Sequence, residues 1–285
     1  MIKNIPEEVW AFDCEWVPDL QAGRLLYHLP EELPSQEVLR IMWEQGGATP
    51  ENPTPFLRTL FCRVVSIATV IRRTLKNGEV QLYLQALPES PDDTAQDEPY
   101  ILRRFLQDGV AARSPQLVGF NSRNADIRIL TQRAIVNGLS LKSLCDRLDA
   151  KPWESADVDL MEMVSGFGKN YAVSLHEIAT LSGIPGKLDT TGDDVCGLWY
   201  SGHRKEIVQY NCFDALTTYL VWLRMAYFSG RLTEESYRVE QQRVKRLIDE
   251  RLQKPENAFL RKYLDAWRAL KTRTGQISDG VFPAD

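Results

Sequence analysis

The chain has 285 residues, of which 44% are hydrophobic, and it carries a net charge of −5. This length suffices for one sizeable α/β core with an appendage or for two small domains, and we favour the single core. No stretch approaches the roughly 18 apolar residues of a membrane span, and five cysteines without a CxxC pair do not suggest a disulfide framework. We therefore expect a soluble, cytoplasmic protein with reduced thiols. The acidic balance argues against a protein that coats nucleic acid non-specifically.

The first third of the chain predicts a strand, a long insertion and a hairpin. Residues 9–15 (VWAFDCE) form a β-type run that ends in polar residues, which is typical of a strand that delivers side chains to a site. Residues 18–60 contain six of the fifteen prolines around a weakly helical stretch at 35–45, and they indicate an insertion or lid. Two β-rich runs, 61–73 and 79–86, flank an Asn-Gly turn, and we expect both to pair with the first strand.

The middle of the chain alternates short strands with helices. The expected elements are a helix at 100–107, a strand at 117–120, a helix at 124–136, a short strand or helix start at 158–163, a helix at 174–181 and a long helix at 205–227. The resulting order is β-β-β-α-β-α-β-α. Beyond residue 230, two amphipathic helices split at Pro255 form a helical extension.

Positive charge is concentrated in this extension. Residues 231–273 contain 12 lysines and arginines against 7 acidic residues, a local charge of +5 that leaves −10 for the remainder of the chain. Such a basic arm is able to guide a nucleic-acid strand, although a solvated helix face is the commoner meaning of such a run.

Three groups of polar residues stand out by their spacing and order. Asp13 and Glu15 are two apart on one strand, so their side chains point to the same face. Tyr210 and Asp214 are four apart on the long helix and share one of its faces. Asp126 lies in a first helical turn, where the helix dipole alone would explain it. Each signal is weak by itself, because a solvated strand end or a chance YxxxD match is common, but the order of the three is distinctive.

That order resembles a known family. FDCEW, GFNSRNAD and YNCFDALTTYLVW are similar to the three exonuclease motifs of the DEDD superfamily, in its tyrosine-bearing (DEDDy) branch. SLHEIATLSGIPGKLDTTGDDV resembles a bacterial family of predicted exonucleases related to the proofreading domain of family B DNA polymerases. The resemblance implies an α/β, ribonuclease-H-like fold, with a central mixed β-sheet flanked by helices and a C-terminal helical extension. It also implies a metal-dependent 3′-5′ exonuclease that releases nucleoside 5′-monophosphates from single-stranded 3′ ends.

The resemblance also assigns roles to the site residues. Carboxylates are the hard oxygen ligands that suit Mg²⁺ or Mn²⁺, and two such ions can act on one phosphodiester. By resemblance, Asp13 bridges both ions, while Glu15 and Asp214 hold the ion that activates water. Asp126 supports the second ion through its shell, and Tyr210 orients the attacking water.

Four further residues are candidates for substrate binding. The sequence departs from the family pattern at Trp16, which replaces the threonine common after DxE, and at Ala125, where an aromatic residue often stands. Trp16 is suited to stack on a base beside the metal ligands. Lys187, in a Gly-rich stretch, is suited to contact a phosphate, although a plain loop explains it as well. Asn121 and Arg123 precede the middle acidic residue; a turn role is favoured for Asn121, and Arg123 is left open.

We expect residues 1–228 to form the exonuclease domain, with the insertion 18–60, and residues 229–285 to form the helical extension. The expected partner is the 3′ end of a single strand, DNA in the first place, with no membrane and no organic cofactor. An RNA 3′-end trimming exoribonuclease is the alternative, because discrimination depends on contacts to the 2′-hydroxyl that no motif reveals. A catalytically silent nucleic-acid-binding module is a further alternative, against which the complete ligand set argues.

Overall fold

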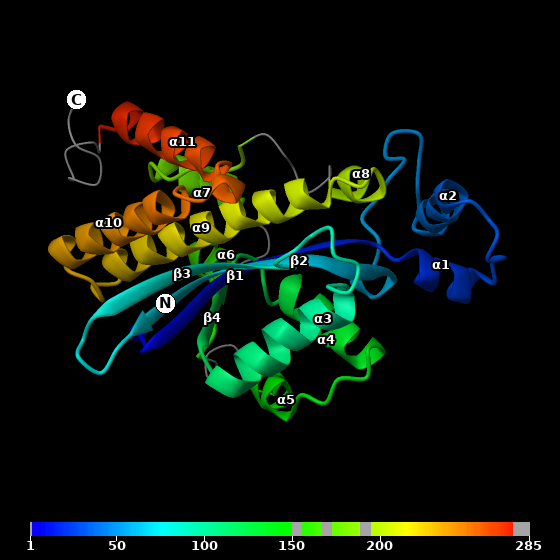
Figure 1. Ribbon diagram of the computed structural model, residues 1–285, viewed down its shortest axis with the longest axis horizontal. Coiled ribbons are helices and arrows are strands. Elements are labelled where there is room, and N and C mark those ends of the chain that lie inside the picture. Colours follow the sequence, from blue (N-terminus) through cyan, green and yellow to red (C-terminus); the bar gives the residue numbers. More distant parts are fainter. Residues whose placement is uncertain (1, 150–155, 167–172, 189–194, 276–285) are drawn as a thin grey trace.

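A five-stranded sheet forms the centre of the computed structural model, which describes residues 2–149, 156–166, 173–188 and 195–275 (Figure 1). The strand order is β3-β2-β1-β4-β5, and the strands are β1 (Glu8–Pro18), β2 (Cys62–Thr74), β3 (Val80–Leu87), β4 (Gln116–Gly119) and β5 (Val158–Asp159). β2 is antiparallel to β1 and β3, whereas β1, β4 and β5 run parallel. The sheet is therefore mixed, and the predicted α/β class with a central mixed sheet flanked by helices is confirmed.

The partner of β3 differs from the prediction. β3 pairs with β2 and not with β1, so the expectation that both hairpin strands pair with the first strand is wrong for the second of them. A strand offers two hydrogen-bonding edges. Those of β1 are taken by β2 along its whole length and by β4 at residues 9–11.

β1 separates two cores because successive side chains of a strand point to opposite faces. The side chains of residues 10, 12 and 14 belong to one core, and those of residues 9 and 11 belong to the other, which α9 (Arg204–Phe228) dominates. Asp13 and Glu15 continue the second series. Their carboxylates therefore face α9 at the end of the strand.

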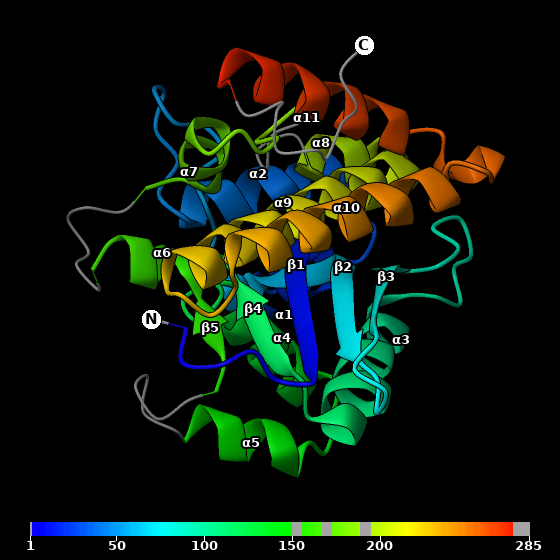
Figure 2. The ribbon, with the colours of Figure 1, turned by 90° about the vertical axis from the view of Figure 1, so that its left-hand side faces the viewer.

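Helices cover both faces of the sheet (Figures 1 and 2). One face carries α3 (Glu98–Leu102) with its π-helical continuation Arg103–Ala111, α4 (Asp126–Val136) and α5 (Lys142–Leu148). The other carries α9, with α7 (Leu175–Leu181), α8 (Val195–Tyr200), α10 (Glu234–Arg251) and α11 (Leu260–Arg273) around it, and α6 (Leu160–Val164) follows β5 directly. Among the described helices, none combines the length and the apolar character that crossing a bilayer requires.

The predicted insertion projects beyond the end of β1 (Figure 1). It contains α1 (Leu20–Tyr27), α2 (Ser35–Gln45) and a short 3-10 helix, Thr59–Phe61. Its two ends meet in a hydrogen bond of 2.8 Å from the Asp19 amide to the Phe61 carbonyl. The buried Asp19 carboxylate also pairs with Arg133 of α4 at 2.8 Å. The insertion is thus fixed at its base to the body of the protein.

The C-terminal helices pack on the same core as α9. Val244 and Ile248 of α10 and Trp267 of α11 are buried there, and Arg72 of β2 forms a buried ion pair of 2.8 Å with Glu240 of α10. Several of the basic residues that were candidates for guiding a strand have partners inside the protein: Arg243 with Glu240, Lys245 with Asp249, and Arg251 with the Leu84 carbonyl. The division of the chain at residue 228 stays a prediction.

Candidate active site

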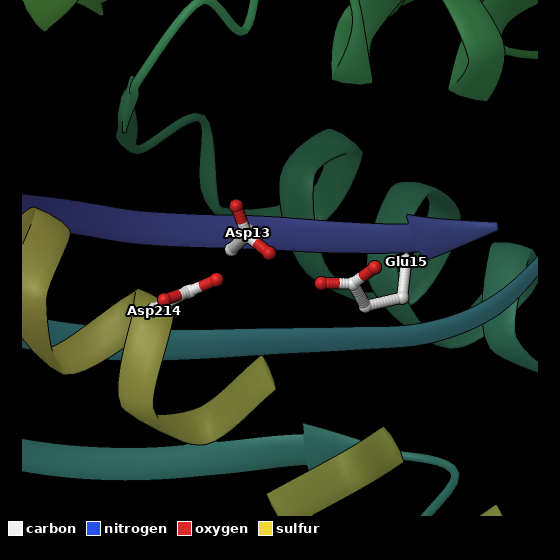
Figure 3. A group of neighbouring side chains, drawn as sticks. All are labelled: Asp13, Glu15 and Asp214. Atoms are coloured by element: carbon white, nitrogen blue, oxygen red, sulfur yellow. The ribbon is translucent and has the colours of Figure 1, made fainter. Parts of the chain in front are cut away.

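β1 and α9 bring three carboxylates together. Asp13 and Glu15 lie on the face of β1 that α9 crosses, and Asp214 of α9 points toward them (Figure 3). One carboxylate oxygen from each residue lies within 4.8 Å of the other two. We call these three residues the carboxylate cluster. Hard oxygen ligands of this kind are those that Mg²⁺ and Mn²⁺ prefer.

Asp126 reaches the same place from the other side of the sheet. It lies in the first turn of α4, as predicted, although the helix begins at Asp126 itself and not at residue 124, and it is 5% exposed. Its Oδ1 accepts a hydrogen bond of 3.1 Å from the Cys14 amide, which β4 leaves without a partner because it ends at Gly119. The cavity there has a volume of 580 Å³, and its lining includes all five predicted catalytic residues: Asp13, Glu15, Asp126, Tyr210 and Asp214.

Tyr210 lies one helical turn before Asp214 on α9, so the two side chains share one face of the helix. Burial raises the pKa of Tyr210 well above its usual range, and the charges of Asp214 and Glu15 raise it further. The phenol therefore keeps its proton near neutral pH and acts as a hydrogen-bond donor. Asn211, which the sequence did not single out, is fully buried beside Tyr210, and its Nδ2 donates to Asp13 Oδ2 at 3.5 Å. Its place inside the YNCFD motif was the available signal.

Burial and mutual repulsion oppose ionisation of the carboxyls. Burial, followed by the charge of Glu15, raises the pKa of Asp13 well above its usual range, and burial with the charge of Asp214 does the same for Glu15. Burial also raises the pKa of Asp214 to about 6 and that of Asp126 to about 7. A divalent cation would relieve this repulsion. The donor atoms and their electrostatics therefore both fit a metal site.

Two of the predicted substrate-binding residues lie at or near the cluster. Trp16 lines the cavity beside Glu15. Lys187 is exposed and does not line the cavity. Its positive charge nevertheless partly offsets the burial that raises the pKa of Glu15 and Asp214, which puts the ammonium group within electrostatic reach of the cluster.

The other two, Asn121 and Arg123, lie in the turn before α4. Asn121 has a positive φ of 59°, and the backbone amides of both residues donate to the carboxylate of Asp159 at 3.0 Å. The Arg123 guanidinium pairs with Glu162 at 3.5 Å. Neither residue lines the cavity, so a direct contact with substrate stays a prediction for both.

The insertion supplies a second wall of the cavity. Residues from this segment that line it are Trp43, Asn52, Thr54, Pro55, Phe56 and Leu57. The proline-rich composition predicted an insertion or lid, but no motif marked which of its residues face the carboxylates.

The fold and the site together define an α/β protein with a buried carboxylate cluster that fits a divalent metal ion. A model of the family described as predicted 3′-5′ exonucleases related to the exonuclease domain of PolB matches residues 54–267. The match spans more than half of the chain, and the chain belongs to this family. The predicted family and enzyme class are thereby confirmed. The family description implies a nucleic-acid substrate, and the carboxylate cluster fits a divalent metal ion. Asp126, Tyr210 and Asp214 lie within the matched segment, whereas Asp13 and Glu15 precede it.

Among solved structures, the chain is similar to the family B DNA polymerase from the hyperthermophilic archaeon Pyrobaculum calidifontis, with 16% sequence identity and a TM-score of 0.46. The alignment covers 95% of this chain and 30% of the polymerase chain. A search of curated proteins gave no match to the sequence.

Proposed function

We propose that the protein removes nucleoside 5′-monophosphates one at a time from the 3′ end of single-stranded DNA. The observation that carries this proposal is the convergence of Asp13, Glu15 and Asp214, whose oxygens lie within 4.8 Å of one another. Three carboxylates at that spacing favour a cation that can also bind a phosphate.

In this proposal the four carboxylates would hold two ions, Mg²⁺ or Mn²⁺. Asp13 would contribute to both ions, Glu15 and Asp214 would hold the ion that activates water, and Asp126 would support the other through its coordination shell. When bound, such ions neutralise the phosphodiester and lower the pKa of water. Asn211 holds the carboxylate of Asp13 in place through its hydrogen bond of 3.5 Å.

Tyr210 orients the attacking water. Because this phenol keeps its proton, it directs the water by hydrogen bonding and does not take the proton itself. The water oxygen forms a bond to phosphorus while the bond from phosphorus to the 3′ oxygen breaks. The leaving 3′ oxygen gains a proton, and the products are a nucleoside 5′-monophosphate and a strand one nucleotide shorter.

Substrate binding and cellular location complete the proposal. Trp16 stacks on a base beside the scissile phosphate, and Lys187 attracts the strand through the charge that it places near the cluster. The reaction needs no organic cofactor, and we place the protein in the cytoplasm.

Digestion of 5′-labelled single-stranded DNA and RNA of one sequence tests the proposal. The reactions contain Mg²⁺ or Mn²⁺, with EDTA controls, and compare the wild-type protein with Asp214→Asn. We expect a ladder that shortens one nucleotide at a time on DNA and that disappears with EDTA or in the variant. A ladder on RNA alone would make the enzyme an exoribonuclease, and intact strands in every reaction would favour a silent binding module.

A further inference from the structure

The cavity that contains the carboxylates is also lined by two aromatic side chains of the insertion, Trp43 and Phe56, which we call the aromatic wall. Trp43 comes from the end of α2, and Phe56 comes from the segment that leads back to β2, so both belong to the insertion. Phe56 is 88% exposed although it lines the cavity. A phenylalanine that is open to solvent beside a metal site has room to be covered by a flat ligand.

The wall is held in a defined place. Leu57, next to Phe56, packs against Gly46 at the end of α2, where a Cβ atom would approach the Leu57 side chain to 2.6 Å. Thr59 bonds to Gln132 of α4 through their side chains at 2.7 Å. The two halves of the insertion are thus in contact with each other, and the returning half is tied to the body of the protein.

The cavity lacks the usual means of holding a nucleic-acid strand. Among the described residues that line it, none is a lysine or an arginine. Phosphates are ordinarily neutralised by those side chains, so the side chains of this cavity, apart from those that would hold metal ions, can contact a strand chiefly through its bases. Single-strand binding proteins do this by stacking bases on aromatic side chains.

We propose that the insertion is a base-binding wall, in which Phe56 and Trp43 stack on the last bases of a single-stranded 3′ end. This inference rests on the proposed function, since it takes the same strand end as the ligand. Stacking tolerates any base because every base has a flat aromatic face. The wall therefore positions a strand end without selecting its sequence.

A binding cycle tests this inference without any cleavage. Wild-type and Phe56→Ala proteins, each carrying Asp214→Asn so that the strand stays intact, are titrated with fluorescent single-stranded DNA in Mg²⁺. The 3′-terminal two nucleotides are either normal or abasic. We expect Phe56→Ala to weaken binding of the normal strand about tenfold, and to leave binding of the abasic strand nearly unchanged. Phe56→Trp should retain tight binding because it keeps the flat ring.

Phe228→Ala is the matched control. Phe228 is 74% exposed at the far end of α9, about 21 Å along the helix from Asp214. This variant, which also carries Asp214→Asn, should bind the normal and the abasic strand as tightly as the protein with Asp214→Asn alone. Equal losses on normal and abasic strands for Phe56→Ala, or no loss on either, would overturn the inference.

The outcome separates the inference from the proposed function. The binding experiment uses inactive protein, so it reports on base stacking whether or not the wild type cuts a strand. If the wild type cuts neither DNA nor RNA, that result alone would refute the proposed function. Conversely, a wild type that shortens DNA while Phe56→Ala binds normally would refute the aromatic wall alone.

Discussion

Four carboxyl groups and a phenol share one cavity, and their mutual effects on ionisation determine how the site responds to pH. Folding raises the pKa of Asp126 to about 7 and that of Asp214 to about 6, in both cases chiefly through burial. In the unfolded chain the pKa of an aspartate is about 4. Between those limits the folded protein binds more protons than the unfolded chain. The contribution of these protons to the free energy of unfolding is therefore fully present below about pH 4, and it is lost as the pH rises through about 7.

This linkage predicts how metal-free protein melts. Asp13→Asn, which removes one charge from the cluster, should lose less stability than the wild type between pH 5 and pH 8, measured as the melting temperature in EDTA. Mg²⁺ or Mn²⁺ at pH 8 should raise the melting temperature of the wild type by several degrees and that of the variant by less. Equal pH dependence and equal metal response in the two proteins would contradict the account of the cluster.

Tyr210 gives a second prediction at this scale. Tyr210→Phe keeps the ring and the packing of α9 but removes the hydroxyl, so kcat should fall roughly 100-fold with little change in melting temperature. Tyr83→Phe, on the partly exposed edge strand β3, is the control and should keep full activity. Unchanged kcat in the first variant would remove Tyr210 from the mechanism.

The spacing of the site residues predicted which of them share a face, and the order of the three motifs, through the family resemblance, predicted that these faces meet. Asp13 and Glu15 follow the period of two in a strand, and Tyr210 and Asp214 follow the period of a helix, so their shared faces could be read from the sequence. Phe56 could not be predicted in this way. Its role depends on how an irregular segment folds back over the strand ends, and irregular segments have no period.

Among the elements, the long periodic ones matched the structure best. The strands at 61–73 and 79–86 and the helix at 205–227 agree with β2, β3 and α9 to within one or two residues. The helices α1, α5 and α8 were not predicted. Each has eight residues or fewer, too few turns for a hydrophobic period to become distinct.

The loop that carries Lys187 is positioned by its neighbours. The Lys187 amide donates to His176 Nδ1 at 3.0 Å, and Thr217 of α9 donates to the Pro185 carbonyl at 2.8 Å. A Cβ atom at Gly186 would meet His176 Nδ1 at 2.3 Å, so a side chain there must displace the loop. The approach of this loop to the cluster therefore depends on a glycine.

Gly186→Ala tests that dependence. We expect the variant to fold, to bind the strand several-fold more weakly in a KM measurement, and to show a weaker salt dependence, because displacing Lys187 removes a positive charge that attracts the phosphates. Gly197→Ala is the control, because a Cβ atom there meets nothing within 4 Å. Equal KM values for Gly186→Ala and Gly197→Ala would show that the loop has no part in binding.

At the scale of the whole molecule, the C-terminal helices are joined to the sheet by a buried charge pair. Arg72 and Glu240 lie 2.8 Å apart with side chains that are 7% and 3% exposed. The sequence showed the basic character of the extension, but a pairing between residues far apart in the chain leaves no local pattern. It could therefore be seen only in the folded protein.

Glu240→Ala should destabilise the protein by about 3–5 kcal/mol, because it leaves the Arg72 charge buried without its main partner. Chemical denaturation measures this loss. Replacing both residues, Arg72→Met with Glu240→Leu, should recover most of it, since an apolar pair of similar volume needs no charge partner. A loss below about 1 kcal/mol in the single variant would place this pair among those that contribute little.

The central claim is that these carboxylates direct water to the last phosphodiester of a strand. The most direct test is digestion of single-stranded DNA in heavy-oxygen water with Mn²⁺, followed by mass spectrometry of the released products. The account predicts nucleoside 5′-monophosphates that carry the heavy oxygen, and none from Asp13→Asn. Nucleoside 3′-monophosphates, internal fragments, or equal release by Asp13→Asn would contradict it.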